Sequence, residues 1–239
     1  MKPFPVAFLL SALALLPVRA PAAEDSKPNV EMGRMQMILL HRAAAAKPGT
    51  PDAATLAAQR QHTDALLQSG KLLFVGDATD NSALREILIL KSADTNEARA
   101  LSAALPAVKA GAWTAESLPW YGPVNLFHPA SDPTKRNDYI FALLVRGTNR
   151  VVLPPEESQK IQEGHMANIR RLGDAGKLAT AGPFVDGGER RGIFIFQVPS
   201  VEAARKLGDT DPAVIAGRLK LELVPIAVPA GILRPERRD

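Results

Sequence analysis

The sequence contains no cysteine. Disulfide bonds, zinc–thiolate sites, iron–sulfur clusters and cysteine nucleophiles are therefore excluded, and so is a lipid anchor attached to a cysteine. The folded chain must be stable through packing alone. Its hydrophobic fraction of 46% is ordinary for a globular protein and is enough to form a core.

Short catalytic motifs are also missing. The chain has no Gly-x-Ser-x-Gly, no phosphate-binding loop and no dinucleotide fingerprint. Its four histidines are dispersed without metal-ligand spacing, so neither a metal site nor a cofactor is predicted. The net charge of +4 is mild and comes without a dense basic block, which argues against nucleic acid as a partner.

The first residues have the pattern of a secretory signal. Lys2 precedes an apolar stretch at 6–18, and Ala20-Pro21-Ala22 matches the small-residue pattern before a cleavage site. We predict a signal peptide at 1–22, a periplasmic or secreted protein, and no stable membrane span after cleavage. An uncleaved anchor is the alternative, although the stretch is short for a span of about 20 residues.

An internal repeat organises the rest of the chain. Shifting the sequence by 106 positions aligns residues 66–119 with 172–225 without a gap, and 19 of these 54 positions are identical. Gly70-Lys71-Leu72 recurs as Gly176-Lys177-Leu178, and Arg85 recurs as Arg191. Such agreement indicates a duplication.

Each copy is predicted to form strand, helix, strand, strand, helix, strand. This βαββαβ order is the ferredoxin-like pattern, whose sheet has helices on one face only. Because the bare apolar face must be covered, we expect an α+β fold in which the two modules pack sheet to sheet within one chain. The predicted elements lie near 35–41, 51–69, 71–76, 84–90, 95–104 and 113–119 in the first copy, and near 138–146, 154–175, 177–182, 191–198, 201–207 and 219–228 in the second. The predicted divisions are an arm at 23–34, module 1 at 35–120, a linker at 121–137, module 2 at 138–230 and a tail at 231–239.

Several segments resemble a known family. Gly164-His165-Met166, Gly176-Lys177-Leu178, Ala181-Gly182-Pro183 and Asp211-Pro212 are similar to the YCII-related family of the dimeric α-β barrel superfamily. Members are usually single modules that dimerise, so the resemblance implies a pseudo-dimer within this chain. Whether two such chains associate further is left open.

The resemblance also implies an active pair. A histidine on the first helix and an aspartate before a proline match His165 and Asp211. In the first copy the aligned positions are Gln59 and Leu105, so that copy is expected to be degenerate. Some relatives resemble muconolactone isomerase and dehydrochlorinase types that break down chlorinated aromatic compounds.

Each member of the pair has a structural alternative. His165 lies on the apolar stripe of its helix with Ile161 and Ile169, as a buried core histidine would. Asp211 precedes a proline-started turn and is suited to be its N-cap. If the pair is functional, the carboxylate would fix the imidazole tautomer and make a general base.

The expected function is the binding of a small cyclic or aromatic acid, with proton transfer of the isomerase or lyase type if the protein is catalytic. Pro183 and Arg191 are candidate substrate contacts, and for Arg191 a hairpin salt bridge is the alternative. Haem, which other members of the superfamily use, would need an axial histidine such as His165, but nothing in the sequence selects it. A non-catalytic binding or structural module is the other reading, and the sequence leaves open whether the protein is an enzyme.

Overall fold

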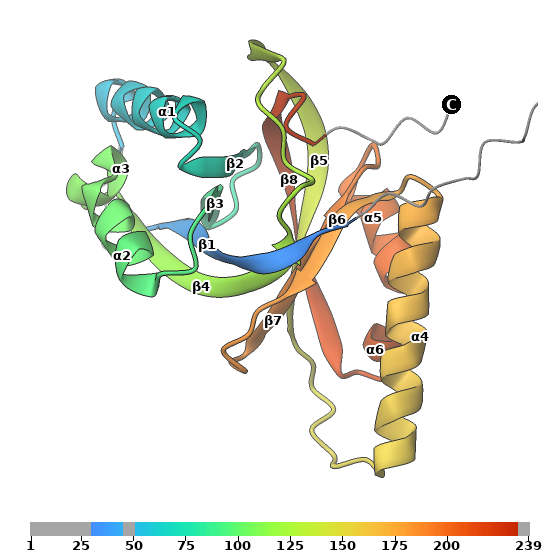
Figure 1. Cartoon of the computed structure of the whole chain (residues 1–239). Coiled ribbons are helices and arrows are strands. Elements are labelled where there is room, and N and C mark those ends of the chain that lie inside the picture. Colours follow the sequence, from blue (N-terminus) through green and yellow to red (C-terminus); the bar gives the residue numbers. More distant parts are fainter. Residues whose placement is uncertain (1–29, 45–50, 234–239) are drawn as a thin grey trace, which may run out of the picture.

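The computed structural model describes residues 30–44 and 51–233 (Figure 1). The predicted signal peptide lies outside the described residues. Each copy forms the expected elements in the expected order. The first contains β1 (Met32–Arg42), α1 (Ala53–Gln68), β2 (Leu72–Ala78), β3 (Leu84–Leu90), α2 (Thr95–Ala104), α3 (Pro106–Lys109) and β4 (Trp113–Pro123). The second contains β5 (Asp132–Arg146), α4 (Pro155–Asp174), β6 (Leu178–Pro183), β7 (Arg190–Phe196), α5 (Val201–Gly208), α6 (Pro212–Ile215) and β8 (Leu219–Ala230).

The eight strands form one sheet that closes on itself. Their order is β4-β1-β3-β2-β8-β5-β7-β6, and the two outer strands meet through a bridge between Trp120 and Phe184. Next to that bridge, the Val185 amide donates to the Pro119 carbonyl at 3.0 Å. The result is a barrel, which leaves no open sheet edge along these seams.

The two seams of the barrel are equivalent. On the second seam Ala78 pairs with Ile226, and the Thr79 amide donates to the Pro225 carbonyl at 2.9 Å. These residues align with those of the first seam under the shift of 106 positions found in the sequence. The modules are therefore related by a pseudo-twofold axis, and the predicted intramolecular dimeric α-β barrel is confirmed.

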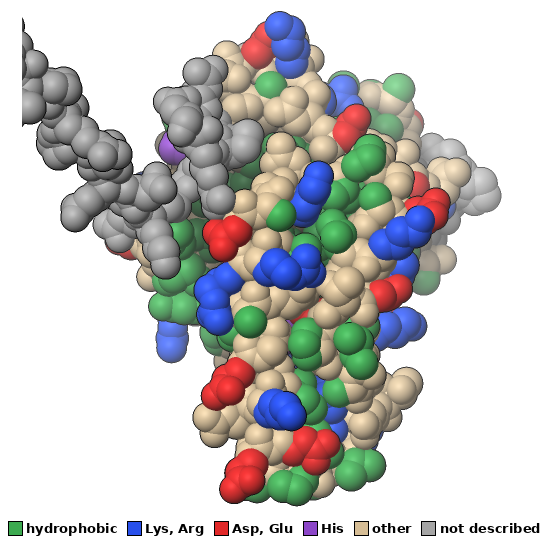
Figure 2. Space-filling view, turned by 90° about the vertical axis from the view of Figure 1, so that its right-hand side faces the viewer, with side chains coloured by type: hydrophobic (Ala, Val, Ile, Leu, Met, Phe, Trp, Pro, Cys, Tyr) green, Lys and Arg blue, Asp and Glu red, His purple; other side chains and the backbone are tan. Residues whose placement is uncertain are grey.

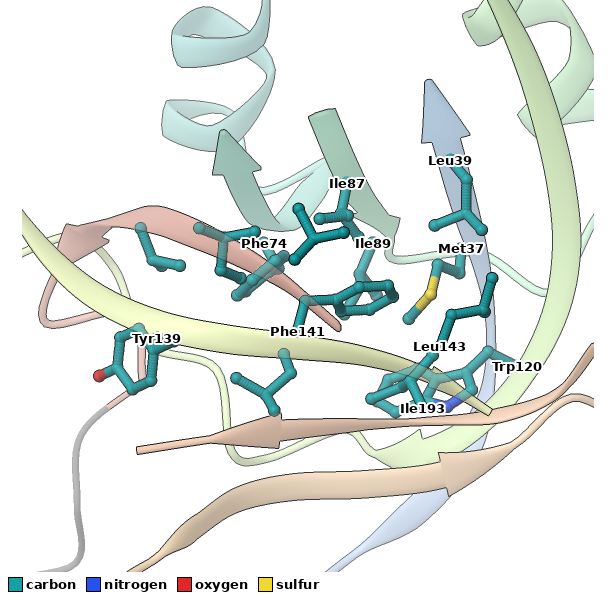
Figure 3. Packing of buried hydrophobic residues seen from close by; sticks show 14 of the residues in the cluster. Met37, Leu39, Phe74, Ile87, Ile89, Trp120, Tyr139, Phe141, Leu143 and Ile193 are labelled. Atoms are coloured by element: carbon teal, nitrogen blue, oxygen red, sulfur yellow. The ribbon is translucent and has the colours of Figure 1, made fainter. Parts of the chain in front are cut away.

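The core has three layers. The barrel interior is filled by side chains from both modules (Figure 3), which is why the bare face of each sheet needs the other. One further apolar cluster lies beneath α1–α3, and another lies beneath α4–α6. Fully buried residues of the interior include Met37, Phe74, Ile89, Trp120 and Phe141. Burial of each such large side chain contributes about 1.5–3 kcal/mol.

Both ends of the segment predicted as linker belong to strands. β4 continues to Pro123, where Met32 is its partner on β1, and β5 begins at Asp132, opposite Ala230 of β8. The prolines of this segment suggested a loop. A proline is nevertheless tolerated on an edge strand, at the start of a strand or at a bulge. Because the pairing partners are distant in the sequence, the local pattern underestimates the length of both strands. Among the described helices, none is long and apolar enough to cross a membrane.

The seam between β4 and β6 requires a glycine. A Cβ atom at Gly182 would clash with the Tyr121 carbonyl oxygen and lie 2.6 Å from Trp120 Nε1. At Gly76, the equivalent position, the nearest atoms are side-chain carbons of Phe74 and Ile226 at 2.9 and 3.2 Å. Backbone atoms cannot move aside as side-chain ends can.

We therefore expect Gly182→Ala to lower the free energy of unfolding by about 1–3 kcal/mol, and Gly76→Ala to cost less. Urea denaturation of both variants measures the difference. Equal losses would mean that the two seams tolerate a Cβ equally well.

Candidate active site beneath α4

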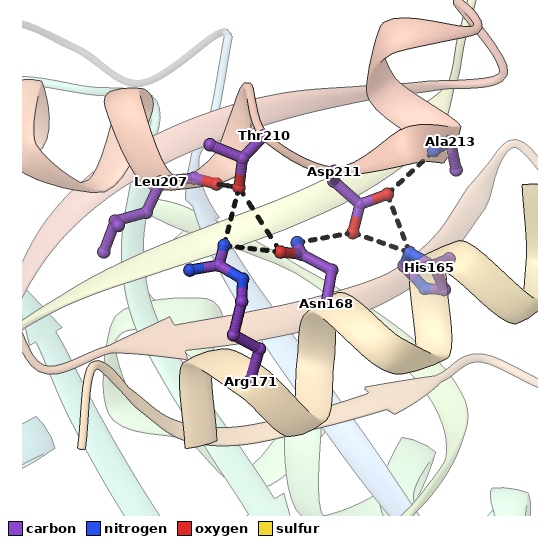
Figure 4. Close-up of polar contacts among 7 residues, drawn as sticks. All are labelled: His165, Asn168, Arg171, Leu207, Thr210, Asp211 and Ala213. Carbon is purple, nitrogen blue, oxygen red and sulfur yellow. Dashed lines mark hydrogen bonds and ion pairs between the residues drawn. The ribbon is translucent and has the colours of Figure 1, made fainter. Parts of the chain in front are cut away.

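The structure brings His165 and Asp211 together. His165 is on α4 and Asp211 is the N-cap of α6, and Nδ1 of the imidazole lies 2.9 and 2.8 Å from Oδ1 and Oδ2 of the carboxylate (Figure 4). Oδ1 also accepts the Ala213 amide at 2.9 Å. Asp211 thus caps the helix and holds the histidine at the same time, so its two predicted roles do not exclude each other.

A glycine lets α6 approach α4 at this point. A Cβ atom at Gly164 would lie 2.9 Å from Cγ of Pro212, the first residue of α6. The close approach places the residue before Pro212 next to the residue after Gly164. On its other side, the His165 ring stacks on Phe194 of β7, with ring centroids 5.9 Å apart and planes inclined by 22°.

The Asp211 carboxylate is completely buried. Burial alone would raise the pKa of this carboxyl, but hydrogen bonds from His165, Asn168 and the Ala213 amide, with the charge on His165, lower the pKa below its usual value. An ionised Asp211 makes Nδ1 of His165 the proton donor in the pair. In the neutral form of the ring, Nε2 then carries the free lone pair.

A polar network that the sequence did not reveal supports the pair. Asn168 donates to Asp211 Oδ2 at 3.1 Å, and Arg171 donates to the Asn168 side-chain oxygen at 2.7 Å. Arg171 also donates to the Thr210 hydroxyl at 3.0 Å. Asn168 lies three residues after His165, a helical spacing that puts both on one face and could have identified it.

A cavity of about 1420 Å³ opens between α4 and the sheet of the second module. His165 lines it, and its side chain is 13% exposed. Since Nδ1 faces Asp211, Nε2 is the ring nitrogen left to the cavity. Apolar residues and arginines dominate the walls, which include Leu144, Arg146, Arg150, Ile161, Ile169, Arg170, Pro183, Arg191, Phe194 and Arg218.

The first copy carries other side chains in the corresponding place. Gln59 stands in place of His165, accepts the Ala107 amide at 3.2 Å and donates to Glu86 at 2.6 Å. Leu105 cannot cap α3, so Gln59 provides the acceptor that Asp211 provides in the second copy. Glu86 aligns with Gly192, so a buried side chain fills the first module where the second has none.

Glu86 is a buried acid. Burial, reinforced by the charge of Asp77, raises the pKa of its carboxyl to about 8, although the hydrogen bond from Gln59 works against the shift. Glu86 is therefore mostly protonated at neutral pH. An amide and a neutral carboxyl thus stand in the first module where the second module has the His165 imidazole and Gly192.

The two predicted substrate contacts lie on the cavity wall. Pro183 and Arg191 both line it. Arg191 Nη1 donates to the carbonyls of Gly187 and Gly188 at 3.1 and 3.3 Å, as Arg85 does in its own hairpin. Its hairpin partners are thus backbone carbonyls and not a carboxylate, and a role in substrate binding stays a prediction. Within 30–44 and 51–233, no three His, Asp or Glu residues group as metal ligands.

Solved structures with the same fold are numerous. Two variants of the chlorite dismutase of Candidatus Nitrospira defluvii match at 10% identity, with TM-scores of 0.54 and 0.53. The matches cover 82% and 84% of this chain and 92% and 91% of theirs. A heme-binding protein from Thermus thermophilus gives a TM-score of 0.49 at 13% identity, covering 83% of this chain and 93% of its own. At such identities the likeness concerns the fold alone, and no curated protein matches the sequence.

A family model gives the sequence relationship. The YCII-related domain matches twice, at residues 35–118 and 140–226, which together span most of the chain. Each match falls on one βαββαβ unit, and the second contains both His165 and Asp211. The protein is a tandem member of the YCII-related family.

Proposed function

We propose that this chain, exported by its N-terminal signal, binds a small cyclic or aromatic acid in the cavity of its second module and transfers a proton within it through His165. The observation that carries the proposal is the bond of His165 Nδ1 to the buried Asp211 carboxylate, while the ring borders the cavity. An ordered imidazole with its basic nitrogen toward a ligand is the arrangement of a general base.

The chemistry follows from the charges of the pair. Nε2 would remove a proton from a carbon next to a carbonyl group of the ligand, and Asp211 would stabilise the imidazolium that forms. Returning that proton to another carbon gives an isomerase, whereas departure of a neighbouring leaving group gives a lyase. Phe194, Ile161 and Ile169 provide the apolar walls that a ring would contact.

Hydrogen exchange of the ligand tests this without knowledge of the product. In D₂O, we expect the protein to replace a carbon-bound proton of a lactone-bearing carboxylic acid with deuterium. The loss of that proton signal is followed by NMR. His165→Gln should slow the exchange by about 10²–10⁴-fold, the usual contribution of a general base.

The first copy supplies a matched control. His165→Gln together with Asp211→Leu reproduces the pair that the first module carries at Gln59 and Leu105, so its fold has a precedent. Substitution of His62, which is outside the cavity lining, should leave exchange unchanged. Exchange that persists in the double variant would refute His165 as the base, and a cavity that binds the acid without exchange would support a binding protein.

Haem is a second candidate ligand. A histidine with a carboxylate on Nδ1 and Nε2 toward a large cavity would also suit a residue that holds haem iron. In that case His165 would hold the iron and the cavity arginines would face the propionates. Haem added to the protein should then give the absorption band of a histidine-ligated iron, which His165→Gln should abolish; that result would replace the proposal above.

A further inference from the structure

Arginines gather where the cavity meets the end of β5. Arg146 is the last residue of that strand, Arg150 follows in the loop to α4, and Arg218 directly precedes β8. All three line the cavity, and none of the residues that line it within the described part of the chain is an aspartate or glutamate. The walls are therefore cationic wherever they are charged (Figure 2 shows the molecule from the side of α4).

The first copy does not share this absence of acids. Three lining positions of the second copy align with acids in the first. They are Arg170, Pro183 and Gly192, which correspond to Asp64, Asp77 and Glu86. At these positions the first module thus carries three carboxyls and the second carries none. This difference indicates that the cavity of the second module is suited to an anion.

Arg146 and Arg150 already lie beside a carboxylate of the protein itself, that of Glu189. Arg150 donates to both oxygens of Glu189, at 3.0 and 3.3 Å, and Arg146 Nε lies 3.7 Å from the same carboxylate. The hydrogen bond from Arg150 lowers the pKa of Glu189 below its usual value. Glu189 is 71% exposed, so this partner is held at the surface and can be exchanged at little cost.

We propose that Arg146 and Arg150 form a carboxylate clamp that binds the acid group of the ligand, and that Glu189 competes with the ligand for it. This inference rests on the proposed function and specifies which end of the cavity receives the acid. Arginine suits the task, because its planar guanidinium matches a carboxylate with two parallel bonds.

The clamp and the histidine lie over different points of β5. Ala142 pairs with Phe194, on which His165 stacks, and Arg146 lies four residues further along the strand, so that its Cα atom is about 13 Å from that of Ala142. We therefore expect a ligand that reaches both to carry its acid group on a side chain, separated from the ring that contacts His165. Phenyl-substituted acids of increasing chain length vary the separation between ring and acid group.

Calorimetric titration with phenylacetate, 3-phenylpropionate and 4-phenylbutyrate, each beside its uncharged primary amide, tests the clamp. We expect the acids to bind more tightly than the amides and one of the longer acids to bind best. Arg150→Gln should weaken the acids about tenfold and leave the amides unchanged. Glu189→Gln should have the opposite effect and strengthen the binding of the acids a few-fold, because it removes the carboxylate that competes for the clamp. Arg99→Gln, the same change on an exposed residue of α2, is the matched control.

The outcomes separate the two proposals. Amides that bind as well as acids, or Glu189→Gln that weakens the acids, would overturn the clamp while ligand binding in the cavity stands. Failure of every acid and amide to bind would overturn the proposed function together with the clamp. Thermal unfolding of each variant shows whether its fold is intact.

Discussion

Asp211→Leu should lower the free energy of unfolding by about 2–4 kcal/mol, because it leaves buried donors without an acceptor. The carboxylate accepts from the Ala213 amide, from Asn168 and from His165, and none of it is exposed to water. Leucine has a similar size but offers these groups nothing. Denaturant unfolding at neutral pH measures the loss.

Adding His165→Gln to Asp211→Leu should recover part of that loss. In the first copy the Gln59 side chain reaches the Ala107 amide directly, at 3.2 Å, beside a leucine at position 105. The equivalent glutamine should reach the Ala213 amide in the same way. We therefore expect the double variant to be more stable than the sum of the single changes predicts, by about 1–2 kcal/mol.

The two single variants and the double variant form a complete thermodynamic cycle. His165→Gln alone retains Asp211 as the cap and should cost less than Asp211→Leu. Additive losses would show that a glutamine at position 165 cannot replace Asp211 as the acceptor for the Ala213 amide. The same double variant serves as the inactive control in the exchange experiment, so stability and chemistry are measured on one protein.

The duplication made most of the fold predictable. One offset of 106 positions predicted two equal modules, and both barrel seams obey it down to the single bonds from Thr79 and Val185. Strand ends were less accessible, because the ends of β4 and β5 are defined by partners on β1 and β8. Local composition around Pro123 pointed to a loop, and long-range pairing overrode it.

The site was predictable only in part. Helical spacing put His165 on the buried face of α4, and the family resemblance paired it with Asp211. Neither could reveal the cavity, which depends on how far the helix stands from the sheet. The aligned copies did contain a signal, since the glutamate at position 86 aligns with a glycine at position 192. A change from a large side chain to none at one position of a repeat indicates that one copy is open and the other is filled.

The filled copy gives the second large effect: Glu86→Gln should stabilise the protein at pH 8 and change little near pH 4.5. The Glu86 carboxyl has a pKa of about 8 in the folded protein, because it is buried. In the unfolded chain it titrates near its ordinary value of 4.5. Between these values the unfolded chain releases a proton that the folded chain retains, so stability falls as the pH rises through this window.

Glutamine removes that pH dependence while keeping the shape of the side chain and its contact with Gln59. Because one pKa unit corresponds to about 1.4 kcal/mol, the gain at pH 8 should be on the order of a few kcal/mol. Denaturant unfolding at several pH values between 4.5 and 8 measures it. Glu163→Gln, an exposed change on α4, should be neutral throughout.

The shape of the pH profile decides the cause of any gain. A gain that is equal at pH 4.5 and pH 8 would come from packing or hydrogen bonding of the amide, and the carboxyl would then be an ordinary ionised acid. A gain that grows across the window would show that the first module retains a neutral carboxyl at the position where the second module, with Gly192, leaves its cavity open. Burial of a proton at Glu86 in one copy, and an accessible base at His165 beside Gly192 in the other, would then be two outcomes of one duplicated site in the fold.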